Sequence, residues 1–326
     1  MVLERVDRFQ RRHPGANFPI AVLYKYFDDT GPYLAALIAY YAFVSLFPLL
    51  LLLATVLGFV LAGNPDLQQE VLHSALAQFP VVGEQLGEPR RLGGGAAGLV
   101  IGILGSLYGG LGVAQAAQYA MNSAWRVPRN SRPNPFKARG RSLVLLGTVG
   151  VAVLGTMALS TVSTPGSGSS GVAVRMLTLA GGVLLNGLLF VFAFRFATTR
   201  QLSVRDVLPG AVGAAVGWQL LQSFGVAYVS HVVRHASATN GVFAIVLGML
   251  AFLYLTAAMV VLCVEVNVVR VDGLHPRALL TPFTDDVRLT PADRRAYTEQ
   301  AQAERTKGFE DVDVTFHPPE TQHRDP

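Results

Sequence analysis

The chain has 326 residues, of which 51% are hydrophobic and only 14% are charged, and its mean hydropathy is +0.41. Soluble domains typically carry about 25% charged residues. The composition therefore excludes an ordinary water-soluble domain and indicates a protein that is solvated largely by lipid.

Six intervals without a charged residue follow one another along the chain, at residues 30–65, 92–125, 142–164, 176–194, 207–230 and 241–264. A helix needs roughly 20 residues to cross the hydrocarbon of a bilayer, so each interval can span it. Each is apolar all round rather than along one stripe, as expected where lipid surrounds a helix. The sequence therefore predicts an all-α, polytopic membrane protein, with a domain of six transmembrane helices over residues 30–270.

Lys and Arg are unevenly distributed between the connections. They concentrate in the N-terminal segment, the second and fourth connections and the tail, whereas the first, third and fifth connections hold Arg90 and Arg91, Arg175, and Arg234. By the positive-inside rule, both termini are expected in the cytoplasm. This asymmetry explains the net charge of +5 without a nucleic-acid partner. About thirty residues of mixed charge precede the first apolar run, so no cleavable signal peptide is expected.

The first two flanking segments are expected to carry amphipathic helices. Residues 1–29 form a cytoplasmic segment in which residues 2–12 make either a short basic helix at the membrane surface or a solvated extension. The first outer connection places apolar residues between Leu67 and Phe79 at helical spacing. This spacing predicts a short amphipathic helix along the outer face.

Residues 271–326 are expected to form a cytoplasmic tail. Thr290 and Pro291 are typical of a helix start, and Asp293 stands in the capping-box position. Gly308 is the predicted end of this helix. Beyond it the polar composition predicts mostly disordered chain.

Pro48 lies near the centre of the first predicted helix, where its ring leaves the carbonyl of Val44 without a backbone donor. An unsatisfied carbonyl in hydrocarbon costs several kcal/mol, and the hydroxyl of Ser45 is the nearest candidate donor. Tyr41, Ser45, Pro48 and Leu52 share one face of this helix. That face is predicted to point into the bundle, either as packing or as the wall of a cavity.

The second predicted helix carries a stripe of small residues against which another backbone can lie closely. Gln115, Tyr119 and Asn122 form a polar strip toward its end. Either interhelical hydrogen bonds or contact with a substrate would explain this strip. The small residues are Gly98, Gly102, Gly105, Gly109, Gly112 and Ala116.

The fifth and sixth predicted helices hold further candidates for the interior. Gln219 and Gln222 are amides at mid-depth, so they should face inward. Tyr254 and Glu265 share a face of the sixth helix, and Arg195 ends the fourth helix at the level of Glu265. The sequence predicts a pair between Arg195 and Glu265, which is either a structural ion pair or part of a proton- or cation-coupled gate.

Several stretches, taken in order, resemble the signature segments of the YihY/BrkB family of bacterial inner-membrane proteins. They include the run from Tyr40 to Pro48, the Asn-x-x-Trp element at Asn122, the Pro-Gly-Ala element at Pro209 and the Glu-x-Asn element at Glu265. The resemblance covers roughly residues 15 to 275. It implies a multi-pass protein of six helices in the bacterial cytoplasmic (inner) membrane. The family was once labelled ribonuclease BN, and some members are linked to envelope lipid traffic.

Two functions fit these features. The mid-membrane proline, the inward amides and the single embedded acid favour transport or translocation of a lipid or an amphipathic envelope component. A membrane scaffold without transport is the alternative. Membrane lipids are the expected partners, a homo-oligomer is left open, and neither nucleic acid nor a cofactor is expected.

A third function, a ribonuclease of the BN type that processes tRNA, is disfavoured by the sequence. Metal-dependent RNA cleavage needs clustered His and carboxylate ligands. The helical pair His231 and His235 lacks the glutamate of a metalloprotease motif. We therefore expect neither a metal site nor enzyme activity.

Overall fold

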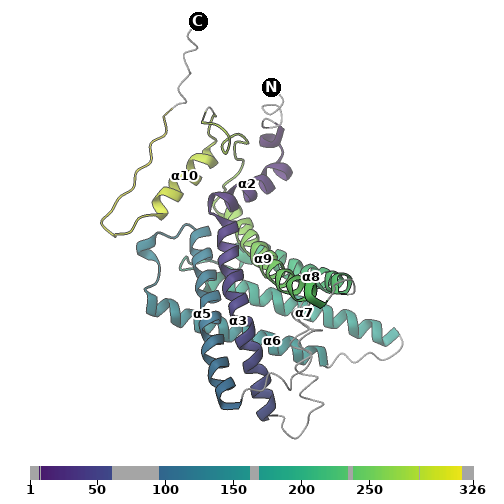
Figure 1. The fold of residues 1–326 in the computed structure, drawn as a ribbon. Helices are drawn as coiled ribbons and strands as arrows, with labels where there is room; N and C mark the ends of the chain where they lie inside the picture. The colour runs from purple at the N-terminus through teal and green to yellow at the C-terminus, as the bar shows by residue number, and fades with distance from the viewer. Residues whose placement is uncertain are drawn as a thin grey trace.

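The computed structural model describes residues 7, 9–60, 95–161, 169–233, 238–285 and 287–317. Every regular element within these ranges is a helix, which confirms the all-α class for this part of the chain (Figure 1). A 3-10 turn, Arg129–Ser131, lies between two of the helices. The helices are α2 (Pro14–Asp28), α3 (Gly31–Val60), α5 (Gly95–Ala124), α6 (Pro135–Thr161), α7 (Ser169–Phe196), α8 (Val204–Val233), α9 (Ala238–Val271) and α10 (Pro291–Ala303).

The six long helices, α3 and α5 to α9, fall on the six intervals without charge. Several continue past those intervals into charged sequence, as at Lys137 in α6 and Arg270 in α9. Among the described residues, Leu99–Ala124 and Val246–Val271 are long and apolar enough to cross a membrane. Gly31–Leu46 and Ala180–Phe196 are shorter apolar helical stretches. The number of spans and their orientation therefore stay predictions.

The long helices pack in a closed circuit. α3 packs on α5, and each following helix from α5 to α9 packs on the next, until α9 returns to α3. α2 packs on both α9 and α3. It lies at the same end of the long helices as α10 (Figure 1). The main cluster of buried apolar side chains is at this end and includes Ala21, Trp125, Phe194 and Leu274.

The proline-bearing face of α3 packs directly on the glycine stripe of α5. A Cβ atom added to Gly102 would lie 3.0 Å from Leu52 Cα, and one added to Gly105 would lie 2.6 Å from Pro48 Cβ. Added Cβ atoms at Gly109 and Gly112 would likewise meet Ser45 and Tyr41. Because the glycines have no side chain, the two backbones approach closely along this contact. Of the two roles predicted for this face of α3, packing is the one that the structure shows at Ser45, Pro48 and Leu52.

The hydroxyl of Ser45 does not repair the hydrogen bond that Pro48 removes. It donates to the carbonyl of Ala42 at 2.9 Å and not to that of Val44. A Ser side chain in a helix readily reaches the carbonyl three or four residues earlier, which places Ala42 and not Val44 within its range. The predicted donor to Val44 was therefore wrong.

Helix α2 was not predicted from the sequence. It starts with Pro14 in its first turn and buries Ala21, Val22 and Tyr26. It ends before Thr30, whose positive φ of 56° redirects the chain into α3. Residues 14–28 thus form a packed helix. The helix predicted over residues 2–12 lies partly outside the described residues, and the one predicted between Leu67 and Phe79 lies wholly outside them.

Helix α10 begins as predicted. The hydroxyl of Thr290 accepts a hydrogen bond from Asp293 N, and the Asp293 carboxylate accepts one from Thr290 N. The helix ends at Ala303, earlier than the predicted Gly308. Disorder is predicted beyond Gly308; residues 309–317 are described and contain no helix, and residues 318–326 lie outside the described residues.

Candidate functional site

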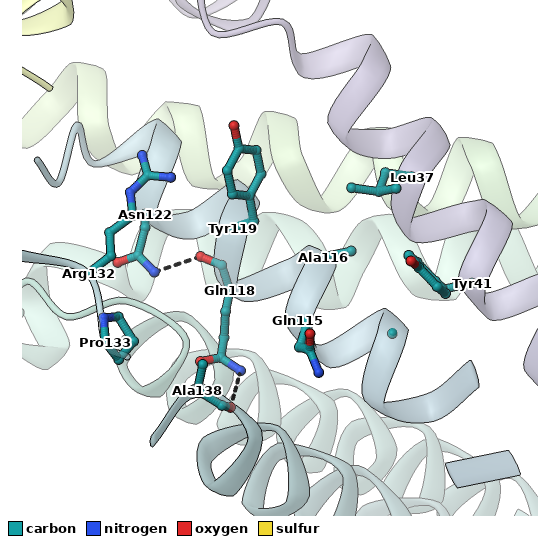
Figure 2. A pocket seen from close by; sticks show the side chains of 11 residues that line it. Leu37, Tyr41, Gln115, Ala116, Gln118, Tyr119, Asn122, Arg132, Pro133 and Ala138 are labelled. Atoms are coloured by element: carbon teal, nitrogen blue, oxygen red, sulfur yellow. Dashed lines mark hydrogen bonds between the residues drawn. The ribbon is translucent and has the colours of Figure 1, made fainter. Parts of the chain in front are cut away.

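A pocket of about 350 Å³ lies where α3, α5 and the start of α6 meet (Figure 2). Leu37 and Tyr41 of α3 form an apolar wall. Four polar side chains line it from α5, and Arg132 contributes from the connection between α5 and α6. Tyr119 is 49% exposed, so the pocket is open to the surface of the chain. The residues that line it are Leu37, Tyr41, Gly112, Gln115, Ala116, Gln118, Tyr119, Asn122, Arg132, Pro133 and Ala138.

Hydrogen bonds fix two of the polar side chains of the pocket. Gln118 Nε2 donates to Ser142 Oγ at 2.8 Å and to the carbonyl of Ala138 at 3.2 Å. Asn122 Nδ2 donates to the carbonyl of Gln118 at 2.8 Å, and its Oδ1 accepts from Thr199 N at 3.0 Å. Asn122 and Gln118 therefore tie α5 to its neighbours and hold one side of the pocket rigid.

The open side of the pocket carries a positive charge. The guanidinium of Arg132 lies 5.1 Å from the centroid of the Tyr119 ring. Its Nε donates to the carbonyl of Val127 at 3.2 Å. Gln115 is exposed beside these residues. The pocket thus combines an apolar wall, amide groups and one cation.

The structure brings together some of the predicted site residues and separates others. Tyr41, Gln115, Tyr119 and Asn122 line the pocket. Ser45 and Pro48 pack between α3 and α5 instead. The other predicted residues lie apart from this pocket, on α8 and α9: Gln219, Gln222, Tyr254 and Glu265.

Gln219 and Gln222 are both partly buried on α8. Trp218 next to them packs against Phe252 of α9, with ring centroids 6.3 Å apart. Neither Gln219 nor Gln222 lines the pocket.

Glu265 pairs with a different cation from the one predicted. Its Oε2 accepts from Lys25 Nζ at 3.3 Å, and both side chains are fully buried. Arg195 instead donates from Nε to the carbonyl of Leu202 at 2.8 Å. The prediction was wrong because Lys25 was counted only among the charges of the cytoplasmic N-terminal segment, whereas α2 carries it into the interior.

Asn267, the other polar residue of the Glu-x-Asn element, faces away from Glu265. Its Oδ1 accepts from Gly210 N at 2.8 Å, and its Nδ2 donates to the carbonyl of Val207 at 3.2 Å. Glu265 therefore joins α9 to α2, whereas Asn267 joins α9 to α8.

Lys25 is at the centre of a buried charge cluster, which we define as Lys25, Asp29, Arg126, Glu265 and Glu299. Lys25 Nζ contacts the carboxylate of Asp29 and donates to the carbonyl of Ala124 at 2.8 Å. Arg126 Nη2 lies 3.7 Å from Asp29, and its Nη1 lies 3.5 Å from Glu299. Arg126 also donates to the carbonyl of Ala296 in α10. The cluster thus joins α2, the end of α5, α9 and α10.

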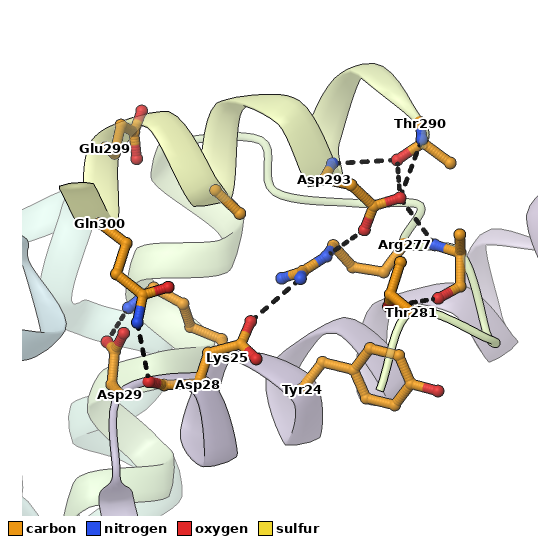
Figure 3. Close-up of polar contacts among 12 residues, drawn as sticks. Tyr24, Lys25, Asp28, Asp29, Arg277, Thr281, Thr290, Asp293, Glu299 and Gln300 are labelled. Atoms are coloured by element: carbon orange, nitrogen blue, oxygen red, sulfur yellow. Dashed lines mark hydrogen bonds and ion pairs between the residues drawn. The ribbon is translucent and has the colours of Figure 1, made fainter. Parts of the chain in front are cut away.

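A second ion pair network fastens the tail to α2 (Figure 3). The buried guanidinium of Arg277 contacts Asp293 at 2.5 Å and Asp28 at 3.0 Å. Burial alone would lower the pKa of Arg277, but these two carboxylates outweigh it and the pKa is raised. Gln300 Nε2 adds a bond of 3.2 Å to the carbonyl of Asp28. The tail is therefore docked on α2 by charge-assisted hydrogen bonds.

Tyr254 lies beside Tyr26 of α2, next to the buried charge cluster. Burial, with smaller contributions from Tyr254 and Glu265, raises the pKa of Tyr26 to about 12. The phenol of Tyr26 is thus neutral over the physiological range. Of the predicted site residues, Tyr254 and Glu265 therefore share one environment.

Sequence reasoning missed the cations of both networks, which are Lys25, Arg126 and Arg277. The spacing of Lys25 and Asp29 was a usable signal, because residues four apart on a helix are neighbours. Arg126 and Arg277 lie in connections, where no periodicity indicates a side chain's direction. Among the described residues, no group of three or more His, Cys, Asp or Glu could hold a metal ion.

Two of the described helices are long and apolar enough to cross a membrane, which is consistent with a helical membrane protein. The chain belongs to the family described as Virulence factor BrkB, whose match covers residues 22–279. The resemblance to the YihY/BrkB family is thereby confirmed. The pocket lies within the matched part, and so do four of the five residues of the buried charge cluster; Glu299 lies outside it.

Two relatives match over most of the chain. The ribonuclease-like protein YfkH of Bacillus subtilis (strain 168) is 26% identical over 268 residues, which are 78% of this chain and 94% of the relative. The inner membrane protein YhjD of Escherichia coli (strain K12) is 23% identical over 280 residues, which are 78% of this chain and 80% of the relative. No solved structure matches the chain significantly.

Proposed function

We propose that the protein binds and translocates a lipid or amphipathic envelope component that has an anionic headgroup. The composition of the pocket carries this proposal, because it sets Arg132 and the amide of Gln115 beside the apolar side chains of Leu37 and Tyr41. A guanidinium binds phosphate or carboxylate through paired hydrogen bonds. The apolar wall suits the start of an acyl chain.

The proposal includes six membrane spans in the bacterial inner membrane, with both termini in the cytoplasm. The inner-membrane description of YhjD and the positions of the six long helices support it. Exposed cations near the pocket, such as Lys137 and Arg139, fit a cytoplasmic face that attracts anionic headgroups. In this proposal the protein is a carrier of lipid and not an enzyme.

The test is lipid transfer in proteoliposomes that contain a fluorescent anionic phospholipid. Arg132→Gln removes the cation of the pocket and should reduce the transfer rate at least several-fold. Arg129→Gln is the matched control, because Arg129 pairs with Glu304 at 2.6 Å and does not line the pocket. Transfer by the wild type no faster than in empty vesicles would refute the proposal for that lipid. Equal loss in both arginine variants would refute the role of the pocket.

A membrane scaffold without transport is the second candidate. The close contact between Pro48 of α3 and Gly105 of α5 favours it. The two helix backbones are packed together there, whereas a wide substrate pathway between them would require them to be separated. A scaffold predicts no transfer of any lipid by a wild-type protein that remains folded in the vesicles. The circular dichroism of the same proteoliposomes distinguishes that outcome from a denatured protein.

A further inference from the structure

The buried charge cluster contains more acids than bases. Lys25 and Arg126 are its two cations, and Asp29, Glu265 and Glu299 are its three carboxyl groups. The side chains of the first four are at most 5% exposed, and that of Glu299 is 32% exposed. If every carboxyl group were ionised, the cluster would hold one uncompensated negative charge with little solvent. An unpaired buried charge is strongly unfavourable, and such a group usually becomes neutral.

The contacts show which carboxyl group is least compensated. Asp29 contacts both Lys25 and Arg126. Within the described part of the chain, Glu265 forms its ion pair with Lys25 alone, through Oε2 at 3.3 Å. Its second oxygen, Oε1, is fully buried and has no hydrogen-bond partner among the described residues. A carboxylate in this position shares its single cation with Asp29 and leaves one oxygen unsatisfied.

We propose that the buried charge cluster is a proton-binding site and that Oε1 of Glu265 is the atom that binds the proton. The proton cancels the excess negative charge and leaves Lys25 paired with Asp29. On release, the O–H bond of Glu265 breaks, its electron pair stays on the carboxylate, and the proton passes to water. The other charged and titratable groups that face Glu265 are Lys25, Tyr26 and Asp29 from α2 and Arg126 from the end of α5.

Glu299 is the residue of the cluster that is in contact with solvent. It faces Arg126 from α10 and, at 32% exposure, is the most exposed of the three carboxyl groups in the cluster. Burial raises the pKa of Glu299 even though Arg126 and Lys25 lower it. In this proposal, a proton released from Glu265 reaches solvent on the α10 side of the cluster, where Glu299 is partly exposed.

Proton release would also change how the helices are held together. Ionised Glu265 competes with Asp29 for Lys25, whose Nζ also holds the carbonyl of Ala124 at the end of α5. The protonation state of one side chain thus bears on the junction of α2, α5 and α9. This inference does not depend on lipid transport, because proton binding can be measured without any substrate.

The test is infrared difference spectroscopy of the purified protein in lipid nanodiscs, titrated from acidic to alkaline pH. The wild type should show the carbonyl band of a protonated carboxylic acid that is lost at alkaline pH. Glu265→Gln should lack this band. The matched control, Glu304→Gln, replaces an exposed surface acid and should retain the band and its midpoint pH.

Asp29→Asn provides a second test that does not rely on the folding of Glu265→Gln. It removes the negative charge that opposes ionisation of Glu265, so the band should disappear at a lower pH than in the wild type. A wild type without a titrating acid band would overturn the proposal. So would a band that survives unchanged in Glu265→Gln, an unshifted midpoint in Asp29→Asn, or a band abolished by sodium ions at constant pH, which would indicate a cation site.

Discussion

The contact between Gly105 and Pro48 allows a quantitative prediction for Gly105→Ala. The added methyl carbon would lie 2.6 Å from both Cβ and Cγ of Pro48. Nonbonded carbons normally lie about 3.5–4.0 Å apart, so α3 and α5 must separate locally by about 1 Å. The pyrrolidine ring cannot rotate away, because it is bonded to its own backbone at two points. The strain must therefore be taken up by the helix backbones.

The expected cost follows from comparison with a glycine that has free space. Overpacking a well-packed contact typically costs about 1–3 kcal/mol. Replacing glycine by alanine also favours the helix by up to about 1 kcal/mol, and this gain is common to every helical glycine. Gly150 in α6 is the matched control, since none of the described residues lies within 4 Å of a Cβ added there. Gly105→Ala should thus be less stable than Gly150→Ala by about 1–3 kcal/mol.

Reversible unfolding in mixed detergent micelles, followed by circular dichroism, measures this difference. Gly112→Ala should fall between the two variants, because the Tyr41 ring that it meets can change rotamer. Equal unfolding free energies for Gly105→Ala and Gly150→Ala would refute the close α3–α5 packing. A larger loss for Gly112→Ala than for Gly105→Ala would refute the argument from the rigid proline ring.

Three further predictions test the junctions of α9 and the tail. Arg277→Met leaves the carboxylates of Asp28 and Asp293 without their cation and should lower the unfolding free energy by about 3–5 kcal/mol. The control Lys307→Met, at an exposed site, should lower it by less than about 0.5 kcal/mol. Similar losses for the two variants in micelle unfolding would contradict the buried network. Asn267→Leu should cost about 1–3 kcal/mol in the same assay, because a buried N–H and a buried carbonyl of α8 lose their partner, and an unchanged value would contradict it. The raised pKa of Tyr26 means that its stabilising contribution is present below pH 10.0 and is lost as the pH rises toward about 12. Alkaline titration of the helical signal should therefore destabilise the wild type more than Tyr26→Phe, and identical profiles would exclude this role.

The long helices could be predicted because a bilayer imposes a simple condition on composition. A helix that crosses hydrocarbon must avoid charge for roughly 20 residues, so intervals without charge mark the elements directly. Helix α2 escaped this criterion because it carries Lys25 and Asp28. Its stability comes from packing on α9 and α3, which a single-chain pattern does not reveal.

The pocket was predictable in part. Gln115, Tyr119 and Asn122 recur at helical spacing, so one helix face brings them together whatever surrounds it. Tyr41 lies on the same face of α3 as Ser45 and Pro48, and this face packs on the glycine stripe of α5. Tyr41 therefore lies next to the polar residues of α5. Arg132 comes from the connection after α5, and its position depends on a chain path that periodicity does not specify.

The wrong partner for Glu265 shows what depth in a membrane can and cannot determine. Arg195 and Glu265 were matched because both lie near the same ends of their helices, and depth is only one coordinate. Two residues at the same depth make contact only if their helices face each other. The helix that packs on α9 beside Glu265 is α2, which carries Lys25. Lys25 is consequently fully buried in an ion pair, as is Arg277, and neither acts as a solvated flanking charge. The basic asymmetry that predicts orientation must therefore rest on exposed residues such as Arg129 and Lys137, which still lie on the predicted cytoplasmic side.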